Sequence, residues 1–229
     1  MLCIQEHWYF SYEKNDLINI SSTHETQAKS VDDYTEKQTF IHERGYGGVA
    51  IFWRKDIDHA IKSHNDGNER INVITVNMKD HPLCIINIYM PSDNSNRDEQ
   101  YKDILSQLEE IIDKFQCQYQ ILLFSDFNAS LHRDNRPRDK CLQQFMESNG
   151  MKLVNGYPTK FTFYHHNQKS TSQIDYIMHK SKEKAMEYRV KILDLEPLNV
   201  SDHTLVIADM LGTVTKKKRK ENVIIKIPD

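Results

Sequence analysis

The sequence predicts a mixed α/β fold in which many strands alternate with a few helices. Short apolar or β-branched runs, each bounded by turn residues, recur along most of the chain. Two segments between them show helical spacing instead. With 229 residues, the chain is long enough for one large domain or two small ones with a sizeable core. No internal repeat is present, which argues against a repeat architecture.

The first quarter of the chain predicts two strands separated by a long connection. Leu2–Gln5 is an apolar run that predicts a strand already in progress at residue 1. Residues 11–44 are polar with little periodicity and predict the connection. The glycines of 45–48 then open the apolar run Val49–Trp53. A turn into a strand is favoured here over a phosphate-binding loop, because no helical pattern follows the glycines.

The middle of the chain predicts a hairpin followed by the clearest helix. Ile71–Val76 and Leu83–Tyr89 are strand-like runs on either side of a turn at His81-Pro82. From Tyr101 to Phe115, apolar residues recur at i, i+3, i+4 and i+7, as in an amphipathic helix. The remaining predicted elements are a strand at 119–124, a shorter helix around Leu142–Met146 capped by Gly150, and strands at Ile174–Met178, Tyr188–Leu195 and Thr204–Met210.

Charge is unevenly distributed along the chain. The segment from Gly212 holds six of the 30 basic and two of the 33 acidic residues, so residues 1–211 carry 24 basic and 31 acidic ones, a net charge of −7. This balance is unusual for a protein whose affinity comes from neutralising phosphates, and it favours divalent cations between the acids and an anionic substrate. The basic run Lys216–Lys220 is typical of a nuclear localisation signal, a phosphate-contacting arm or a solvated linker.

Targeting signals and cysteine usage indicate an intracellular protein, nuclear or cytoplasmic, with no membrane partner. The first residues lack the basic region and apolar core of a signal peptide, and no apolar stretch is long enough to span a bilayer. The four cysteines are widely spaced and form no CxxC pair, which favours a reducing compartment and argues against a structural zinc site.

The stretch Ile121–Phe124 is an apolar run that ends abruptly in Ser125-Asp126-Phe127-Asn128. A buried, unpaired carboxylate at the end of a strand would cost several kcal/mol, so Asp126 needs a metal, a cation or a donor network. The alternative is an ordinary strand followed by an Asx-type turn, in which Asp126 and Asn128 only shape the backbone. This stretch alone leaves both interpretations open.

Further polar residues lie at predicted strand boundaries: Glu6, His7, Tyr89, Asp175, Asp202 and His203. Asp175 has apolar neighbours on both sides, which indicates burial and a partner, and His203 is the candidate. Each residue also has a plain structural interpretation, such as a surface acid, a core-edge ring or a turn cap. Together they provide what metal-assisted phosphoester cleavage requires: carboxylates for a hard cation, a base for water, and donors for the developing charge.

The order of these motifs resembles that of the endonuclease/exonuclease/phosphatase superfamily over residues 2–210. The matching blocks are Leu2-Cys3-Ile4-Gln5-Glu6-His7-Trp8, Gly47-Gly48-Val49-Ala50-Ile51-Phe52, Asn87-Ile88-Tyr89-Met90-Pro91, Ser125-Asp126-Phe127-Asn128-Ala129, Gln173-Ile174-Asp175-Tyr176-Ile177 and Ser201-Asp202-His203. Among its branches, the chain looks most like the endonuclease domain of a non-LTR (LINE-type) retrotransposon. The basic tail resembles the stretch that leads towards a reverse transcriptase.

The resemblance implies a role for each matched residue. Glu6 would be the principal ligand of Mg²⁺ (or Mn²⁺), and Asp202 would assist metal or water binding. Asp126 would orient or deprotonate the attacking water, and Asn128 would hold both it and the phosphate. Tyr89 would donate to a non-bridging phosphate oxygen. His203 would stabilise the pentacovalent phosphorane, and Asp175 would orient His203. DNA contacts would come from residues within or beside a groove-probing hairpin at 164–170: Tyr164, His165 and Ser172.

The implied fold is a four-layered α/β sandwich of the DNase I type: two facing mixed or antiparallel sheets, helices outside, and the site at one rim. The domain is expected to cover residues 1–211, followed by a basic tail at 212–229. The chain departs from the family pattern in two ways. Ser125 stands where a glycine is usual, and the first strand and helix of the family, with their asparagine, are expected to be missing.

Three functions are compatible with the sequence. The leading hypothesis is a Mg²⁺-dependent endonuclease that nicks DNA, leaves 3′-hydroxyl and 5′-phosphate ends, and belongs to a polyprotein with a reverse transcriptase. The second is a phosphatase or phosphodiesterase of the same fold that acts on another phosphoester, which the acidic body favours. The third is an inactive remnant or binding module, which the short N-terminus favours.

Overall fold

A six-stranded sheet forms the centre of the computed structural model, which describes residues 1–33, 45–92, 98–133, 136–166, 170–180, 188–196 and 198–215. The strands, in spatial order, are β4 (Ile61–His64), β5 (Ile71–Val76), β6 (Leu83–Tyr89), β7 (Gln120–Asp126), β11 (Asp175–Lys180) and β8 (Met151–Leu153). β6 and β7 are parallel, whereas the other described neighbours are antiparallel. The parallel register places Tyr89 beside Asp126, so both strands end at the same rim.

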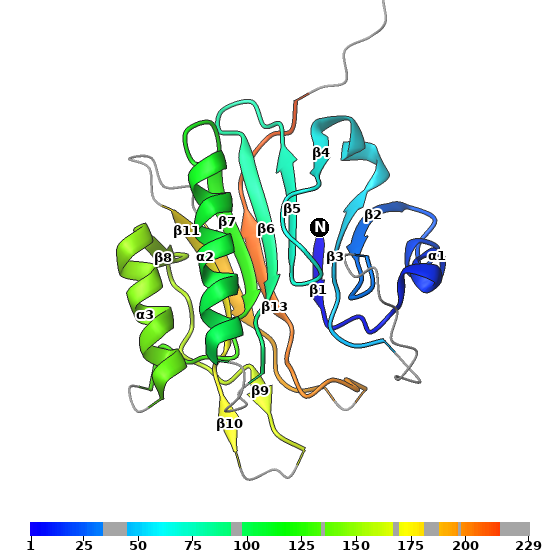
Figure 1. Ribbon diagram of the computed structural model, residues 1–229. Coiled ribbons are helices and arrows are strands. Elements are labelled where there is room, and N and C mark those ends of the chain that lie inside the picture. The colour runs from blue at the N-terminus through cyan, green and yellow to red at the C-terminus, as the bar shows by residue number, and fades with distance from the viewer. Residues whose placement is uncertain are drawn as a thin grey trace, which may run out of the picture.

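The helices α2 (Asp98–Phe115) and α3 (Pro137–Asn149) cover one face of this sheet (Figure 1). Alternate residues of β6 face them, among them Ile86 and Ile88, while Leu83 and Ile85 face the opposite side. The predicted apolar stripe of α2 is buried along its whole length. Gly150 has a φ of 62° and ends α3 in the left-handed conformation, as predicted for a helix cap.

A second layer of strands packs on the other face of the central sheet. It consists of β1 (Leu2–Gln5), β3 (Val49–Arg54) and β2 (His24–Lys29) in the order β1-β3-β2, together with the hairpin of β12 (Tyr188–Ile192) and β13 (Val206–Met210). Helix α1 (Lys14–Ile18) lies outside this layer, because Leu17 packs on Ala50 and Phe52. The predicted four-layered sandwich is therefore confirmed.

The long connection predicted for residues 11–44 is wrong over much of its length. This region contains the short 3₁₀ helix η1 (Ser11–Glu13), helix α1 and strand β2, while residues 34–44 lie outside the described part. β2 is polar, but it pairs along its whole length with β3 and so obtains its hydrogen bonds from a partner remote in sequence. Other short elements were not predicted: η2 (Lys55–Ala60), β4 and β8. The strands β9 (Phe163–Tyr164) and β10 (Thr171–Ser172) pair on either side of the hairpin segment expected at 164–170.

Residues 213–215 stay in contact with the domain beyond the predicted boundary at residue 211. The Lys79 N–H donates to the carbonyl of Thr213, and the Thr215 N–H donates to the carbonyl of Asn77. The boundary itself stays a prediction, and residues 216–229 of the predicted basic tail lie outside the described residues. Among the described residues, no helix has the length and apolar character needed to cross a bilayer.

Candidate active site

Asp126 is the last residue of β7, and its carboxylate is buried at the rim of the central sheet. It accepts hydrogen bonds from the main-chain N–H of Asn128 at 2.9 Å and from the side-chain amide of Asn128 at 3.2 Å. The same amide donates to the carbonyl of Met90 at 2.9 Å. An Asx-type turn and a buried carboxylate thus occur together, and the two interpretations of this stretch do not exclude each other. Asn128 acts directly on Asp126.

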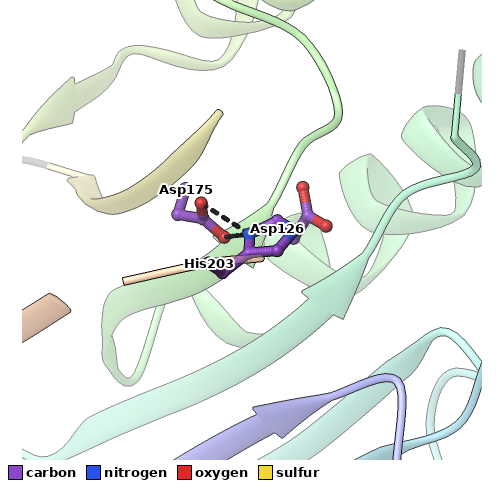
Figure 2. A group of neighbouring side chains, drawn as sticks. All are labelled: Asp126, Asp175 and His203. Carbon is purple, nitrogen blue, oxygen red and sulfur yellow. Dashed lines mark hydrogen bonds and ion pairs between the residues drawn. The ribbon is translucent and has the colours of Figure 1, made fainter. Parts of the chain in front are cut away.

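Asp175 begins β11 and lies opposite Asp126 in the antiparallel register. His203 reaches it from the loop before β13: Nδ1 is 3.0 and 3.1 Å from the two carboxylate oxygens of Asp175 (Figure 2). One ligand atom from each of Asp126, Asp175 and His203 falls within 4.8 Å of the others. The pairing of β7 with β11 brings Asp126 and Asp175 together, and the loop before β13 adds His203 from still further along the chain.

The charges in this cluster are coupled. Burial raises the pKa of Asp126 well above its usual range, and the nearby charge of Asp175 adds to the rise, while His203 and the hydrogen bond from Asn128 act in the opposite direction. Burial lowers the pKa of His203, but the hydrogen bond and charge of Asp175, with Asp126 and Glu6, outweigh it and raise that pKa to about 9. His203 is therefore a cation at neutral pH and faces two acids.

Glu6 follows β1 in a left-handed conformation with a φ of 56°. Its main-chain N–H donates to the carbonyl of Gly48 at 2.9 Å, which joins the Glu6 turn to the start of β3. The exposed carboxylate of Glu6 accepts a hydrogen bond from the hydroxyl of Tyr89. Burial raises the pKa of Tyr89 above its usual value, and the bond to Glu6 raises it further. Tyr89 is thus a neutral donor across the physiological pH range.

Gly48 leaves room for the ring of His7. A Cβ on Gly48 would lie only 2.4 Å from the imidazole, and the glycine has a φ of +84°. His7 Nε2 is 3.0 Å from the carbonyl of Lys29, and Nδ1 accepts a hydrogen bond from the Tyr9 N–H at 3.1 Å. The structure thus confirms the predicted turn into a strand. The contacts of His7 also fix the chain directly after Glu6.

The predicted DNA contacts lie on the β9–β10 hairpin, which extends away from the body of the domain (Figure 1). Tyr164 pairs with Thr171, and its N–H donates to the main-chain carbonyl of Asp202 at 2.8 Å. His165 stacks on the neighbouring His166 ring, with centroids 4.1 Å apart. Residues 167–169 of the predicted groove-probing segment lie outside the described residues. The hairpin is thereby attached to the loop that carries His203.

Asp202 stands apart from the cluster, although the motif pairs it with His203. Its side chain is exposed. Among the described residues, this carboxylate makes no hydrogen bond or ion pair with the side chains of the other candidate site residues. The predicted metal pair Glu6 and Asp202 is therefore not brought together by any side-chain contact in the described part of the chain. The described carboxylates that converge are those of Asp126 and Asp175.

Arg133 links the loop after β7 to the β9–β10 hairpin. Its guanidinium donates to Ser172 Oγ at 3.0 Å and makes two 3.0 Å bonds to Asp139, which is fully buried. Asp139 also accepts from the Ser130 N–H at 2.7 Å. Arg133 lies in a short polar loop with no periodic pattern, so no sequence signal pointed to it. Its contacts fix Ser172 of β10 to the loop after β7.

Ser125, the departure from the family pattern, fits its position. It lies within β7, is not among the described residues with positive φ, and its hydroxyl donates to the carbonyl of Tyr176 at 3.0 Å. A side chain is costly only where φ is positive, so the serine causes no strain here.

The donor set suits a hard divalent cation. Glu6 and Asp126 offer carboxylate oxygens, the ligands that Mg²⁺ prefers in proteins. Glu6 is connected to this rim through Tyr89, which donates to Glu6 and lies beside Asp126 in the parallel register. Burial of Asp126 beside a second acid also leaves a charge imbalance that a cation would relieve.

Comparison with known proteins agrees with this geometry. A protein-family model described as "Endonuclease-reverse transcriptase" matches residues 83–207. No curated protein sequence matches the chain. Among solved structures, the endonuclease domain of TRAS1, a telomere-specific non-LTR retrotransposon, has a TM-score of 0.58 at 15% identity and covers 81% of this chain and 78% of its own.

Two further solved structures come from enzymes described as phosphatases. The 3′ phosphatase NExo from Neisseria, bound to a product DNA hairpin, has a TM-score of 0.62 at 17% identity, covering 91% of this chain and 88% of its own. A mannosyl-6-phosphatase from Bacteroides thetaiotaomicron has a TM-score of 0.58 at 15% identity, covering 91% and 85%. At such identities these similarities establish the fold alone, and the fold hosts both nucleases and phosphatases.

Proposed function

Because the chain belongs to the endonuclease/exonuclease/phosphatase family, a family of phosphoester hydrolases, we propose that it is a Mg²⁺-dependent endonuclease that nicks DNA. The products would be a 3′-hydroxyl, able to prime reverse transcription, and a 5′-phosphate. The observation that carries this proposal is the convergence of Asp126, Asp175 and His203 within 4.8 Å, next to the bonded pair Glu6 and Tyr89.

Glu6 would be the principal ligand of the metal, and Asp202, whose exposed side chain lies on the loop that also carries His203, would assist metal or water binding. A bound Mg²⁺ would neutralise charge on the phosphate and its oxygens. Asp126 has a basicity raised by burial, which suits a residue that orients water and accepts its proton. Asn128 supports this role by donating to the Asp126 carboxylate.

His203 supplies positive charge to the phosphoryl group. Asp175 orients the imidazole through Nδ1 and keeps it protonated, which leaves Nε2 as a cationic donor. Tyr89 would exchange its bond to Glu6 for a non-bridging phosphate oxygen. DNA as substrate is supported by the β9–β10 hairpin, which extends away from the domain (Figure 1) and whose Phe163 ring packs on the ring of His203, with centroids 5.1 Å apart. The parent polyprotein would supply the reverse transcriptase.

A second substrate class has its own support. Residues 1–211 carry a net charge of −7, which disfavours a long polyanion and favours a small phosphoester. Phosphatase activity on a nucleotide, phosphoinositide or sugar phosphate is therefore the alternative to DNA nicking.

Nicking of supercoiled plasmid, followed by gel electrophoresis, tests the proposal. We expect conversion to open circles with Mg²⁺, none with EDTA, and none with Asp126→Ala or His203→Ala. Asp209→Ala, an exposed acid on β13, is the matched control and should nick like the wild type. Nicking that survives both site substitutions would indicate a contaminating nuclease and refute the assignment. A parallel assay with p-nitrophenyl phosphate and a 3′-phosphorylated oligonucleotide identifies the alternative class.

A further inference from the structure

Arg70 is a buried cation beside the candidate site that the mechanism above does not use. It lies directly before β5, and the whole residue is only 8% exposed. Its guanidinium carbon is 5.2 Å from the centre of the Tyr89 ring, and NH1 is 3.5 Å from the Tyr89 carbonyl. Among the described residues, the buried Nε has no hydrogen-bond partner, and Arg70 forms no ion pair.

The position of Arg70 is set by the main chain and not by its charge. The Arg70 N–H donates to Asn68 Oδ1 at 2.8 Å, and the Arg70 carbonyl accepts from the Tyr89 N–H at 2.9 Å. These bonds continue the pairing of β5 with β6 and would persist with an apolar side chain at this position. A buried guanidinium without a carboxylate partner costs folding free energy, so stability does not explain its presence.

The Tyr89 ring joins Arg70 to the catalytic rim. The ring also faces the turn that pairs with Glu6 and Trp8, since a Cβ added at Gly47 would lie 3.9 Å from Tyr89 Cε1. The Tyr89 hydroxyl donates to Glu6. The nearby charged groups that act on Tyr89 are the acids Glu6 and Asp126 and the cation Arg70. Arg70 thus opposes the negative charge that would repel a phosphate at this point.

We propose that Arg70 is a positioning residue for Tyr89: the stacked guanidinium orients the ring and polarises its O–H, so that Tyr89 is a stronger donor to a non-bridging oxygen of the phosphoester. A cation over an aromatic face is attracted to the ring and draws electron density from it. The planar guanidinium suits such stacking better than a compact ammonium group does. This inference rests on the proposed phosphoester hydrolysis and concerns how one donor of that site is prepared.

Kinetics with matched variants test the inference. The set is Arg70→Met, Arg70→Lys, Tyr89→Phe and the double variant Arg70→Met/Tyr89→Phe. Arg54→Met is the control, because the Arg54 side chain is 68% exposed and pairs only with Asp56 among the described residues. We expect Arg70→Met to lower kcat about tenfold with little change in KM. The melting temperature should stay equal or rise, because a buried charge has been removed.

The double variant separates a role through Tyr89 from a general one. If Arg70 acts through the phenol, adding Arg70→Met to Tyr89→Phe should change kcat less than about twofold, as expected for coupled positions. Arg70→Lys should restore part of the activity. Independent, multiplicative losses would overturn the inference. So would a fall in melting temperature that accounts for the lost activity.

A measurement without turnover keeps the inference testable if the substrate is wrong. With 3-fluorotyrosine placed at position 89, the ¹⁹F spectrum should show a single sharp resonance that shifts or broadens in Arg70→Met but not in Arg54→Met. An unchanged spectrum would refute the positioning role. Inactivity of the wild type on plasmid and on both phosphatase substrates would instead refute the proposed function, and the spectrum would still decide on Arg70.

Discussion

The two strand layers contribute to the site in different ways. In the central sheet, every residue of β5 and β6 is buried, and the strands deliver Tyr89, Asp126 and Asp175 to one rim by register alone. In the second layer, β1 and β13 are half-buried at most positions. This layer delivers Glu6 and His203 from turns and loops, one of them with left-handed backbone.

The two layers hold their site residues in different ways. Residues fixed by register can move only if the central sheet unfolds, whereas residues on loops depend on bonds between the layers. Of the hydrogen bonds between the layers, those from Tyr89 to Glu6 and from His203 to Asp175 join candidate site residues directly. The arrangement of the candidate site therefore exists only while the two layers are docked.

Substituting one acid from each layer tests whether the two layers supply groups with different roles. Asp126→Asn should lower nicking about 10³-fold, the middle of the range for a lost proton acceptor, and added metal should not restore it. Glu6→Gln should instead raise the Mg²⁺ concentration needed for half-maximal nicking by about 10–100-fold, since it weakens only metal binding. Titration of Mg²⁺ against nicking rate measures both. Identical metal dependence in the two variants would contradict the division of roles.

An apolar substitution in the central sheet should lower the unfolding free energy more than one in β1 of the second layer. Ile86 is fully buried in β6, so Ile86→Ala should cost about 3–4 kcal/mol of unfolding free energy through lost transfer and cavity terms. Ile4 is half-buried in β1, and Ile4→Ala should cost about 1 kcal/mol. Urea denaturation followed by circular dichroism measures both values. Equal costs would show that the second layer is as tightly packed as the central sheet.

The pair that joins the layers should make stability depend on pH. The pKa of His203 is raised from 6.5 to about 9 in the folded state, so its contribution is complete below pH 6.5 and is lost as the pH rises through 9. We expect the wild type to lose about 2–3 kcal/mol relative to His203→Gln over this interval. Comparison with that variant cancels the opposite trend from Lys29, whose pKa is lowered to about 8. Parallel pH profiles for the two proteins would exclude the effect.

The smallest expected effect concerns Ser125 in the central layer. Restoring the glycine usual in the family, Ser125→Gly, should destabilise the domain by about 1 kcal/mol, because it frees the unfolded chain and removes the bond to Tyr176. Nicking should be unchanged. Thermal unfolding compared with Ser125→Ala, which removes only the hydroxyl, separates the two contributions. A stabilised glycine variant would mean that Ser125 is strained after all.

Local patterns predicted the elements whose periodicity is strong. The stripe from Tyr101 to Phe115 and the paired runs of β5 and β6 are visible in the sequence because their burial repeats at helix or strand spacing. β2 was not predicted, since its polar residues pair with β3 and carry no alternation. Arg70 and Arg133 were not predicted as site residues for the same reason. Their partners Tyr89, Asp139 and Ser172 are not related to them by helix or strand spacing.

The sequence alone was enough to predict the fold class, the superfamily and which polar residues lie at the strand ends. These follow from the spacing of apolar residues and from the order of the motifs. Only the tertiary structure decided which of them meet. It placed Asp126 against Asp175 and His203, left the side chain of Asp202 exposed, and set Arg70 beneath Tyr89. The pairing of strands remote in sequence and the docking of two sheets bring distant residues together, and a single local pattern does not specify which strands pair.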